Sequence, residues 1–240
     1  MSHNCTRILV LLLLLAYSAN SNSSELRVGF IERPPHIYSN ADGTIKGSLS
    51  KRLHTLFQQA GVKAKLIPFD IEDINNLFSF KEVDAFITTK LIVDVPKDYF
   101  FSEKPVVTLK FYAYSLASVP KVNKLEDLRN TSIILPMSVD TIRGQTKDWL
   151  LDSKNGIEIV TDIGDLQQAI PKLLEGKAEY VISATGPSGS AMMFSRRLNN
   201  NSIKSSPIFT LPMYLTVRKS VGDSARMIDQ VNRILSKRNN

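Results

Sequence analysis

Apolar residues in the first part of the chain alternate between short runs and helical spacing. Three short runs predict buried strands: Leu26–Ile31, Ala64–Phe69 and residues 84–87. Between the first two, apolar residues recur at helical spacing over residues 48–60, and Gly61 is a natural helix stop. Asp70 or Asp73 could cap a second helix before the third run. This alternation predicts a parallel sheet with right-handed crossovers.

Residues 106–117 have no helical spacing and predict an extended connection between two lobes. A second alternating unit follows this segment. Strands are expected at 132–135, 157–161 and 180–183, and helices at 124–128, 139–151, 165–175 and 192–198. After a polar linker, residues 207–217 are extended again and residues 223–237 predict a closing helix. We therefore expect two α/β lobes: residues 25–106 with 212–240, and residues 110–208. The hinges are predicted near 106–110 and 208–212.

The first 21 residues have the pattern of a secretory signal rather than of a folded element. Arg7 supplies the positive region, residues 8–16 are apolar, and cleavage is expected after Ser18 or Ser21. The apolar run is far shorter than the roughly 20 residues of a membrane-spanning helix. Because Cys5 precedes that run, the exported protein is expected to be neither a lipoprotein nor disulfide-bonded, which favours the periplasm.

Charge and composition exclude some partners. The formal net charge is +7, and loss of Arg7 with the signal would leave +6, which favours anionic ligands in general. The basic residues are scattered, with no run longer than Arg196-Arg197 or Lys237-Arg238, and no aromatic ladder lies between them. Nucleic acid is therefore not an expected partner. A soluble monomer is the prediction.

Polar residues follow the third predicted strand at the point where it ends. Thr88, Thr89 and Lys90 come directly after the run at 84–87. Ligands of open α/β sheets bind outside the carboxyl ends of the strands. These three residues are therefore predicted to bind a ligand, although solvation alone could also account for a polar strand end.

Three stretches together resemble the family 3 extracellular solute-binding proteins. They are LRVGFIERPPHIYSNADGTIKGSLSKRLHTLFQQAG, VDAFITT with FSEKP, and LLEGKAEYVIS. The resemblance implies an α/β, two-lobed periplasmic binding protein type 2 fold, with two Rossmann-like lobes joined by two hinge strands and a ligand cleft between them. It further implies capture of a small polar ligand for an ABC-type transporter, with an inner-membrane permease as partner.

The chain departs from that family where amino-acid binders hold their ligand. The arginine expected six residues before Phe101 is Val95, and the acid expected near Ser183 or Ala184 is absent. Arg33 replaces the usual aromatic, and His36 replaces a phenylalanine. These departures argue against an ordinary zwitterionic ligand, so we predict one that is anionic or amino-acid-like.

Four further residues could bind such a ligand. Lys97 competes with Lys90 as the cation that replaces the missing arginine, and Arg33 could supply a flat face and a charge. Ser138 precedes a predicted helix start and could bind an anion or cap the helix, and Arg143 could reach the same place or lie on the surface.

Nothing in the sequence points to a metal, a cofactor or catalysis. His3, His36 and His54 have no carboxylate at metal-ligand spacing, and no G-x-S-x-G, Walker-type loop or cysteine nucleophile occurs. We predict no enzyme activity. Two alternatives stay open: a ligand-sensing accessory protein for a receptor ectodomain, and a dehydratase of the same fold with Glu32 as its acid.

Overall fold

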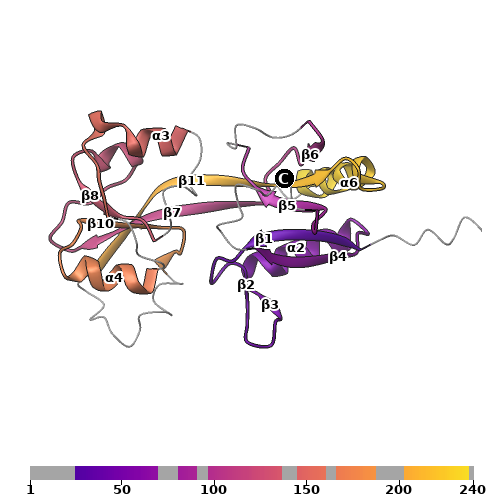
Figure 1. Cartoon of the computed structure of the whole chain (residues 1–240), viewed down its shortest axis with the longest axis horizontal. Helices are drawn as coiled ribbons and strands as arrows, with labels where there is room; N and C mark the ends of the chain where they lie inside the picture. Colours follow the sequence, from indigo (N-terminus) through magenta and orange to yellow (C-terminus); the bar gives the residue numbers. More distant parts are fainter. Residues whose placement is uncertain are drawn as a thin grey trace, which may run out of the picture.

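Two groups of elements are joined by two long strands. The computed structural model describes residues 25–69, 81–90, 97–136, 145–160, 166–187 and 203–237. The connecting strands are β7 (Val107–Leu116) and β11 (Ile203–Arg218), which run between the two groups in Figure 1. They pair antiparallel from Ile203 opposite Leu116 to Met213 opposite Val107. The extended passages predicted from the sequence are confirmed, and the hinge limits within them stay a prediction.

Lobe 1 contains the predicted parallel sheet. Its strands are β1 (Leu26–Ile31), β4 (Ala64–Phe69) and β5 (Ala85–Thr88), in the order β4-β1-β5-β11. β1 pairs parallel with both β4 and β5. Helices α2 (Ser48–Gln59) and α6 (Ser224–Lys237) share one buried core with β1 and β5, in which Val28, Leu53 and Val231 are fully enclosed. The helix predicted after Asp70 lies outside the described residues.

Lobe 2 repeats the plan with a smaller sheet. Its elements are η2 (Leu125–Leu128), β8 (Ser132–Ile134), α3 (Gln145–Leu151), η4 (Ser153–Asn155), β9 (Glu158–Val160), α4 (Leu166–Leu174) and β10 (Tyr180–Ser183). The sheet order is β7-β10-β8-β9, with the last three strands parallel. The helix predicted at 124–128 is a single 3₁₀ turn, and the helix predicted at 192–198 lies outside the described residues.

Three short strands had no counterpart in the sequence prediction. β2 (Tyr38–Ser39) and β3 (Ile45–Lys46) form a hairpin around the turn at residues 40–43. β6 (Tyr99–Phe101) adds to β11, with Phe101 opposite Thr216. Strands of two or three residues are too short to show an alternating pattern, and their tertiary partners define them.

Ser102, in the FSEKP motif, anchors the chain to β11. Its side chain is fully buried, its backbone N–H donates to the Leu215 carbonyl at 2.8 Å, and its hydroxyl accepts from the Leu215 N–H at 3.1 Å. The same hydroxyl donates to the Lys104 carbonyl at 2.9 Å. The motif therefore holds the last turn before β7 against the strand that crosses between the lobes.

Ser102→Ala is expected to lower the free energy of unfolding by about 1–2 kcal/mol, because it leaves the buried Leu215 N–H without its acceptor. Urea denaturation followed by circular dichroism measures the change. Ser118→Ala, at an exposed serine, is the matched control and should change stability by less than about 0.5 kcal/mol. Equal effects of the two substitutions would contradict an anchoring role for Ser102.

Candidate functional site

The carboxyl ends of β1 and β5 lie at one edge of the lobe 1 sheet. The two strands pair in parallel, with Val28 opposite Ala85 and Gly29 opposite Phe86. Arg33 follows the end of β1 by two residues, and Lys90 follows the end of β5 by two residues. The structure therefore brings together Arg33 and the Thr88–Lys90 group, which lie far apart in sequence.

The last residue of β5 and the two that follow it differ in exposure. Thr88 is buried opposite Tyr214 of β11, Thr89 is half-buried, and Lys90 is exposed. The Lys90 ammonium lies 4.3 Å from the centroid of the Tyr214 ring. The negative face of the ring attracts the ammonium, so the contact places the Lys90 head group at this edge.

The loop after β1 is fixed by its own backbone. The Arg33 N–H donates to the Ile37 carbonyl at 2.6 Å, and the His36 N–H donates to the Arg33 carbonyl at 2.7 Å. The Leu49 N–H, in the first turn of α2, donates to the His36 carbonyl at 2.7 Å. The loop contains a cis peptide bond between Pro34 and Pro35. These contacts fix the backbone positions from which the side chains of Arg33 and His36 project.

This loop of lobe 1 contacts lobe 2 directly. Nε2 of His36 lies 3.2 Å from the Ala184 carbonyl oxygen, just past β10, and the Thr185 hydroxyl donates to the Pro34 carbonyl at 3.3 Å. The Tyr114 hydroxyl donates to the Thr185 carbonyl at 2.5 Å, which fixes the lobe 2 side of the contact. The edge that carries Arg33 is therefore where the two lobes meet.

Arg33 is a half-buried cation at this meeting point. Desolvation by the surrounding protein lowers the pKa of its guanidinium from the ordinary value. Part of the residue still reaches solvent. The guanidinium is therefore partly removed from water near the contact between the lobes.

The other predicted site residues do not join this group. Lys97 lies just before β6, in which Tyr99 pairs with Arg218 of β11. The Arg218 N–H donates to the Asp84 carbonyl, just before β5. Lys97 is therefore at the amino end of β5, the edge opposite to that of Arg33 and Lys90. Whether Lys90 or Lys97 replaces the missing arginine stays a prediction, and only Lys90 lies at the edge that carries Arg33. Ser138 and Arg143 lie outside the described residues.

Glu32, beside Arg33 in sequence, has a local role. Its carboxylate accepts from the Ser39 N–H at 2.8 Å and so fastens the start of the β2–β3 hairpin to the loop after β1. It is an exposed residue, and the causes of the Arg33 pKa shift do not include its charge.

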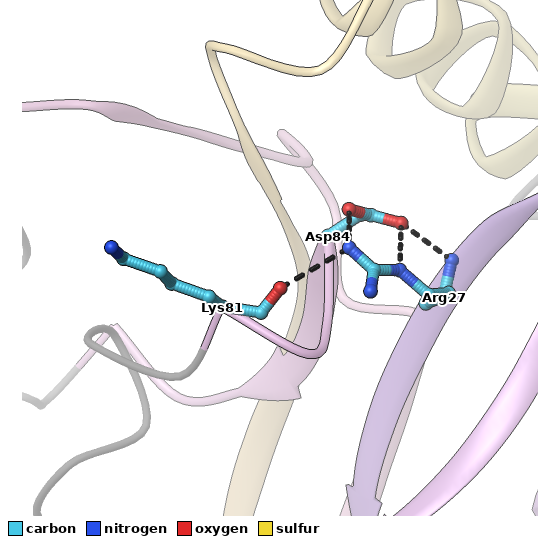
Figure 2. Close-up of polar contacts among 3 residues, drawn as sticks. All are labelled: Arg27, Lys81 and Asp84. Atoms are coloured by element: carbon cyan, nitrogen blue, oxygen red, sulfur yellow. Dashed lines mark hydrogen bonds and ion pairs between the residues drawn. The ribbon is translucent and has the colours of Figure 1, made fainter. Parts of the chain in front are cut away.

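A pocket of about 600 Å³ lies at the opposite edge of lobe 1, lined by residues that include Arg27, Lys81, Asp84 and Arg218. Figure 2 shows the Arg27 guanidinium facing Asp84, with distances of 2.8 Å and 3.0 Å to the carboxylate oxygens, and the Lys81 carbonyl as a further acceptor. The Arg27 N–H also donates to that carboxylate at 2.9 Å. These groups satisfy one another and join the starts of β1 and β5.

Among the described residues, no group of three or more His, Cys, Asp or Glu side chains could hold a metal ion. Within the same ranges, no helix is long and apolar enough to cross a membrane.

No protein-family profile and no curated protein sequence matches the chain. Solved structures do match. An ancestral arginine-binding protein bound to arginine superposes with a TM-score of 0.61 at 18% identity, covering 90% of this chain and 92% of that one. A periplasmic binding protein of an arginine transport system from Legionella pneumophila gives 0.60 at 14% identity, with 90% and 93% covered. A histidine kinase sensor domain with similarity to periplasmic binding proteins gives 0.62 at 15% identity, with 90% and 92% covered.

The likeness establishes the fold. The chain has the mixed α/β, two-lobed fold of the periplasmic binding proteins, as the sequence predicted. At these identities the comparison does not carry a ligand over to this chain.

Sequence reasoning missed the interlobe contact of His36 and Thr185, and it missed the Tyr114 hydroxyl that holds Thr185. The sequence marks His36 as a departure from the family loop and as a histidine without metal-ligand spacing, and it gives no sign of a bridge between the lobes. A polar residue two positions after the strand at 180–183 and a histidine in a proline-rich loop were the available signals. Neither shows its partner, because 148 residues separate His36 from Ala184.

Proposed function

We propose that the chain is a periplasmic solute-binding protein that holds a small polar ligand between its lobes and delivers it to an ABC-type transporter. One observation carries the proposal: the loop after β1 bonds to the end of β10 at the sheet edge that carries Arg33 and Lys90. A molecule bound there contacts both lobes, so its binding favours the arrangement in which they lie close together.

The structural neighbours support binding and transport. Two are named as arginine-binding or arginine-transport proteins. Their ligand is not assumed for this chain, because Val95 and Ala184 replace the expected arginine and acid of the family. The predicted signal at residues 1–21 supports a periplasmic location.

A sensing role is the second candidate. One neighbour is the sensor domain of a histidine kinase. In that role the chain would bind the same kind of ligand and present a ligand-dependent surface to a receptor ectodomain rather than to a permease.

Catalysis is not part of the proposal. Glu32, the one acid that the sequence suggested for a dehydratase, uses its carboxylate to accept from the Ser39 backbone. The neighbours compared above are named as binding proteins and a sensor domain.

A ligand of this site should raise the melting temperature. Ligand at a hundred times its dissociation constant stabilises the folded state by about 2.7 kcal/mol. For a chain of this size that corresponds to a rise of roughly 5–10 °C. Differential scanning fluorimetry against a panel of polar metabolites measures it. If no compound shifts the melting point, the solute-binding proposal fails.

Two lysine variants locate the binding. Lys90→Ala should reduce the shift, because it removes a charge at the interlobe edge, whereas Lys97→Ala, at the opposite edge, should leave it unchanged. Affinity capture from detergent-solubilised inner membranes then separates the two roles. Recovery of a permease supports transport, and recovery of a receptor supports sensing.

A further inference from the structure

The backbone acceptors at the interlobe contact are already engaged. The Ala184 carbonyl oxygen lies 3.2 Å from Nε2 of His36, the Pro34 carbonyl accepts from the Thr185 hydroxyl, and the Thr185 carbonyl accepts from Tyr114. On its other side, Nδ1 of His36 lies 3.4 Å from the Ser48 hydroxyl, which orients the ring. Each of these three carbonyls already accepts one hydrogen bond, so a ligand ammonium would have to share it with the donor that is present.

The carboxylates of the described residues do not supply the missing acceptors. Glu32 is the acid next to this edge in sequence, and its Oε1 accepts from the Ser39 N–H. Ala184, at the end of β10, has no side-chain acceptor, and Ser183 uses its hydroxyl to accept from the Thr185 N–H at 3.1 Å. In the part of lobe 2 that the structure describes, the end of β10 therefore offers a cationic group of a ligand no carboxylate.

The same edge carries positive charge without a matching acid. Among the described residues, no acceptor lies within hydrogen-bond distance of the Arg33 guanidinium, which is half-buried. Lys90 lies over the Tyr214 ring and is not paired with a carboxylate in these ranges. A guanidinium taken partly out of water without a partner is costly, and it presents a planar fork that matches a carboxylate.

We propose that this site takes a small organic carboxylate that carries no ammonium group. Arg33 is its main anchor, and His36 occupies the contact to the Ala184 carbonyl that an ammonium would otherwise require. The proposal rests on the proposed solute-binding function and names the chemical class of its ligand. Lys90 adds positive charge at the rim, which draws an anion toward the site.

Matched pairs of acids test the ligand class by isothermal titration calorimetry. The probes are glutarate with glutamate, succinate with aspartate, and butyrate with 2-aminobutyrate, with inorganic phosphate as a further anion. At least one acid without an amino group should bind at least tenfold more tightly than its amino-acid counterpart. Equal or tighter binding of the amino acids, or tightest binding of phosphate, overturns the inference and leaves the solute-binding function standing. Failure of every probe to bind counts against both.

Arg33→Met separates a ligand anchor from a structural arginine. It should weaken binding of the best acid at least a hundredfold, while the melting temperature of the ligand-free protein stays unchanged or rises, because an unpaired half-buried charge has been removed. The matched control is Arg233→Met, at an exposed arginine on α6, which should keep wild-type affinity. A clear fall in the ligand-free melting temperature of Arg33→Met, or unchanged affinity, overturns the role of Arg33.

A designed reversal tests the role of His36. The double substitution His36→Ala and Ala184→Asp frees the contact and provides a carboxylate there, so the preference for the acid over its amino-acid counterpart should fall at least tenfold. The single substitution Ala184→Asp should do less, because the new carboxylate would pair with His36. An unchanged preference in the double variant shows that His36 does not exclude the ammonium.

Discussion

Replacing Gly47 by alanine is expected to lower the free energy of unfolding by about 3 kcal/mol and to displace the loop that carries Arg33 and His36. Gly47 has φ +109°, and a Cβ there would lie 2.2 Å from the His36 carbonyl oxygen and 2.7 Å from that of Pro35. The strained backbone and the clash each cost about 1–3 kcal/mol. Because both contacts are backbone atoms, the loop itself must shift.

Two measurements detect these effects. The melting temperature should fall by roughly 6–12 °C for a chain of this size. The NMR signals of the His36 ring should move, because its bond to the Ala184 carbonyl depends on the loop position.

Gly43→Ala is the matched control for Gly47→Ala. Gly43 also has a positive φ, +78°, but a Cβ there would meet nothing within 4 Å. Its substitution should cost about 1 kcal/mol from backbone strain alone. If the two substitutions lower the stability equally and the His36 signals do not move, the close approach of Gly47 to the loop determines neither the stability nor the loop position.

Asp84→Asn is expected to lower the free energy of unfolding by about 2 kcal/mol at pH 7. The Asp84 carboxylate accepts from the backbone N–H of Arg27 and from two nitrogens of its guanidinium, and it joins β1 to the start of β5. Hydrogen bonds to a charged group are worth about 1.5–3 kcal/mol, and the exposure of Arg27 places the value toward the lower part of that range.

The effect of Asp84 should depend on pH. Desolvation raises the pKa of Asp84, but the hydrogen bonds and charge of Arg27, with the charge of Arg218, outweigh it, so the net pKa is lowered. A carboxyl with a lowered pKa in the folded state stabilises the protein fully above its unfolded value, about 3.9, and this contribution is lost as the pH falls through the folded pKa. The difference between wild type and Asp84→Asn should therefore shrink below about pH 4.

Urea denaturation at a series of pH values measures both statements about Asp84. Glu175→Gln is the matched control, because Glu175 forms an exposed pair with Lys172 at 3.4 Å that should contribute less than about 0.5 kcal/mol. A difference between wild type and Asp84→Asn that is constant from pH 7 to pH 3 would mean that the charge of Asp84 is not what stabilises the fold.

The VDAFITT and FSEKP stretches show how a motif can be recognised before its role is known. The sequence marked both as parts of a binding fold. In the structure Asp84 and Ser102 are anchors, since one joins two strands and the other holds a turn against β11. The part of these stretches that lies at the ligand edge is the strand end from Thr88 to Lys90, next to Arg33 in the loop after β1.

The sequence by itself determined the two-lobed α/β fold, the parallel pairing expected of β1, β4 and β5, and the two long crossing strands. These follow from local apolar patterns, which are strong where an element is long and buried on one face. It also placed Arg33 and Lys90 directly after strands, where ligands of α/β sheets bind.

Only the tertiary structure decided which of those residues meet. It put Lys97 at the opposite edge, set Arg33 beside the interlobe contact, and joined His36 to Ala184 from the other lobe. Such pairings depend on how the two crossing strands bring distant segments together. No local pattern encodes that arrangement, because the partners are separated by many residues and their contact is a product of the whole fold.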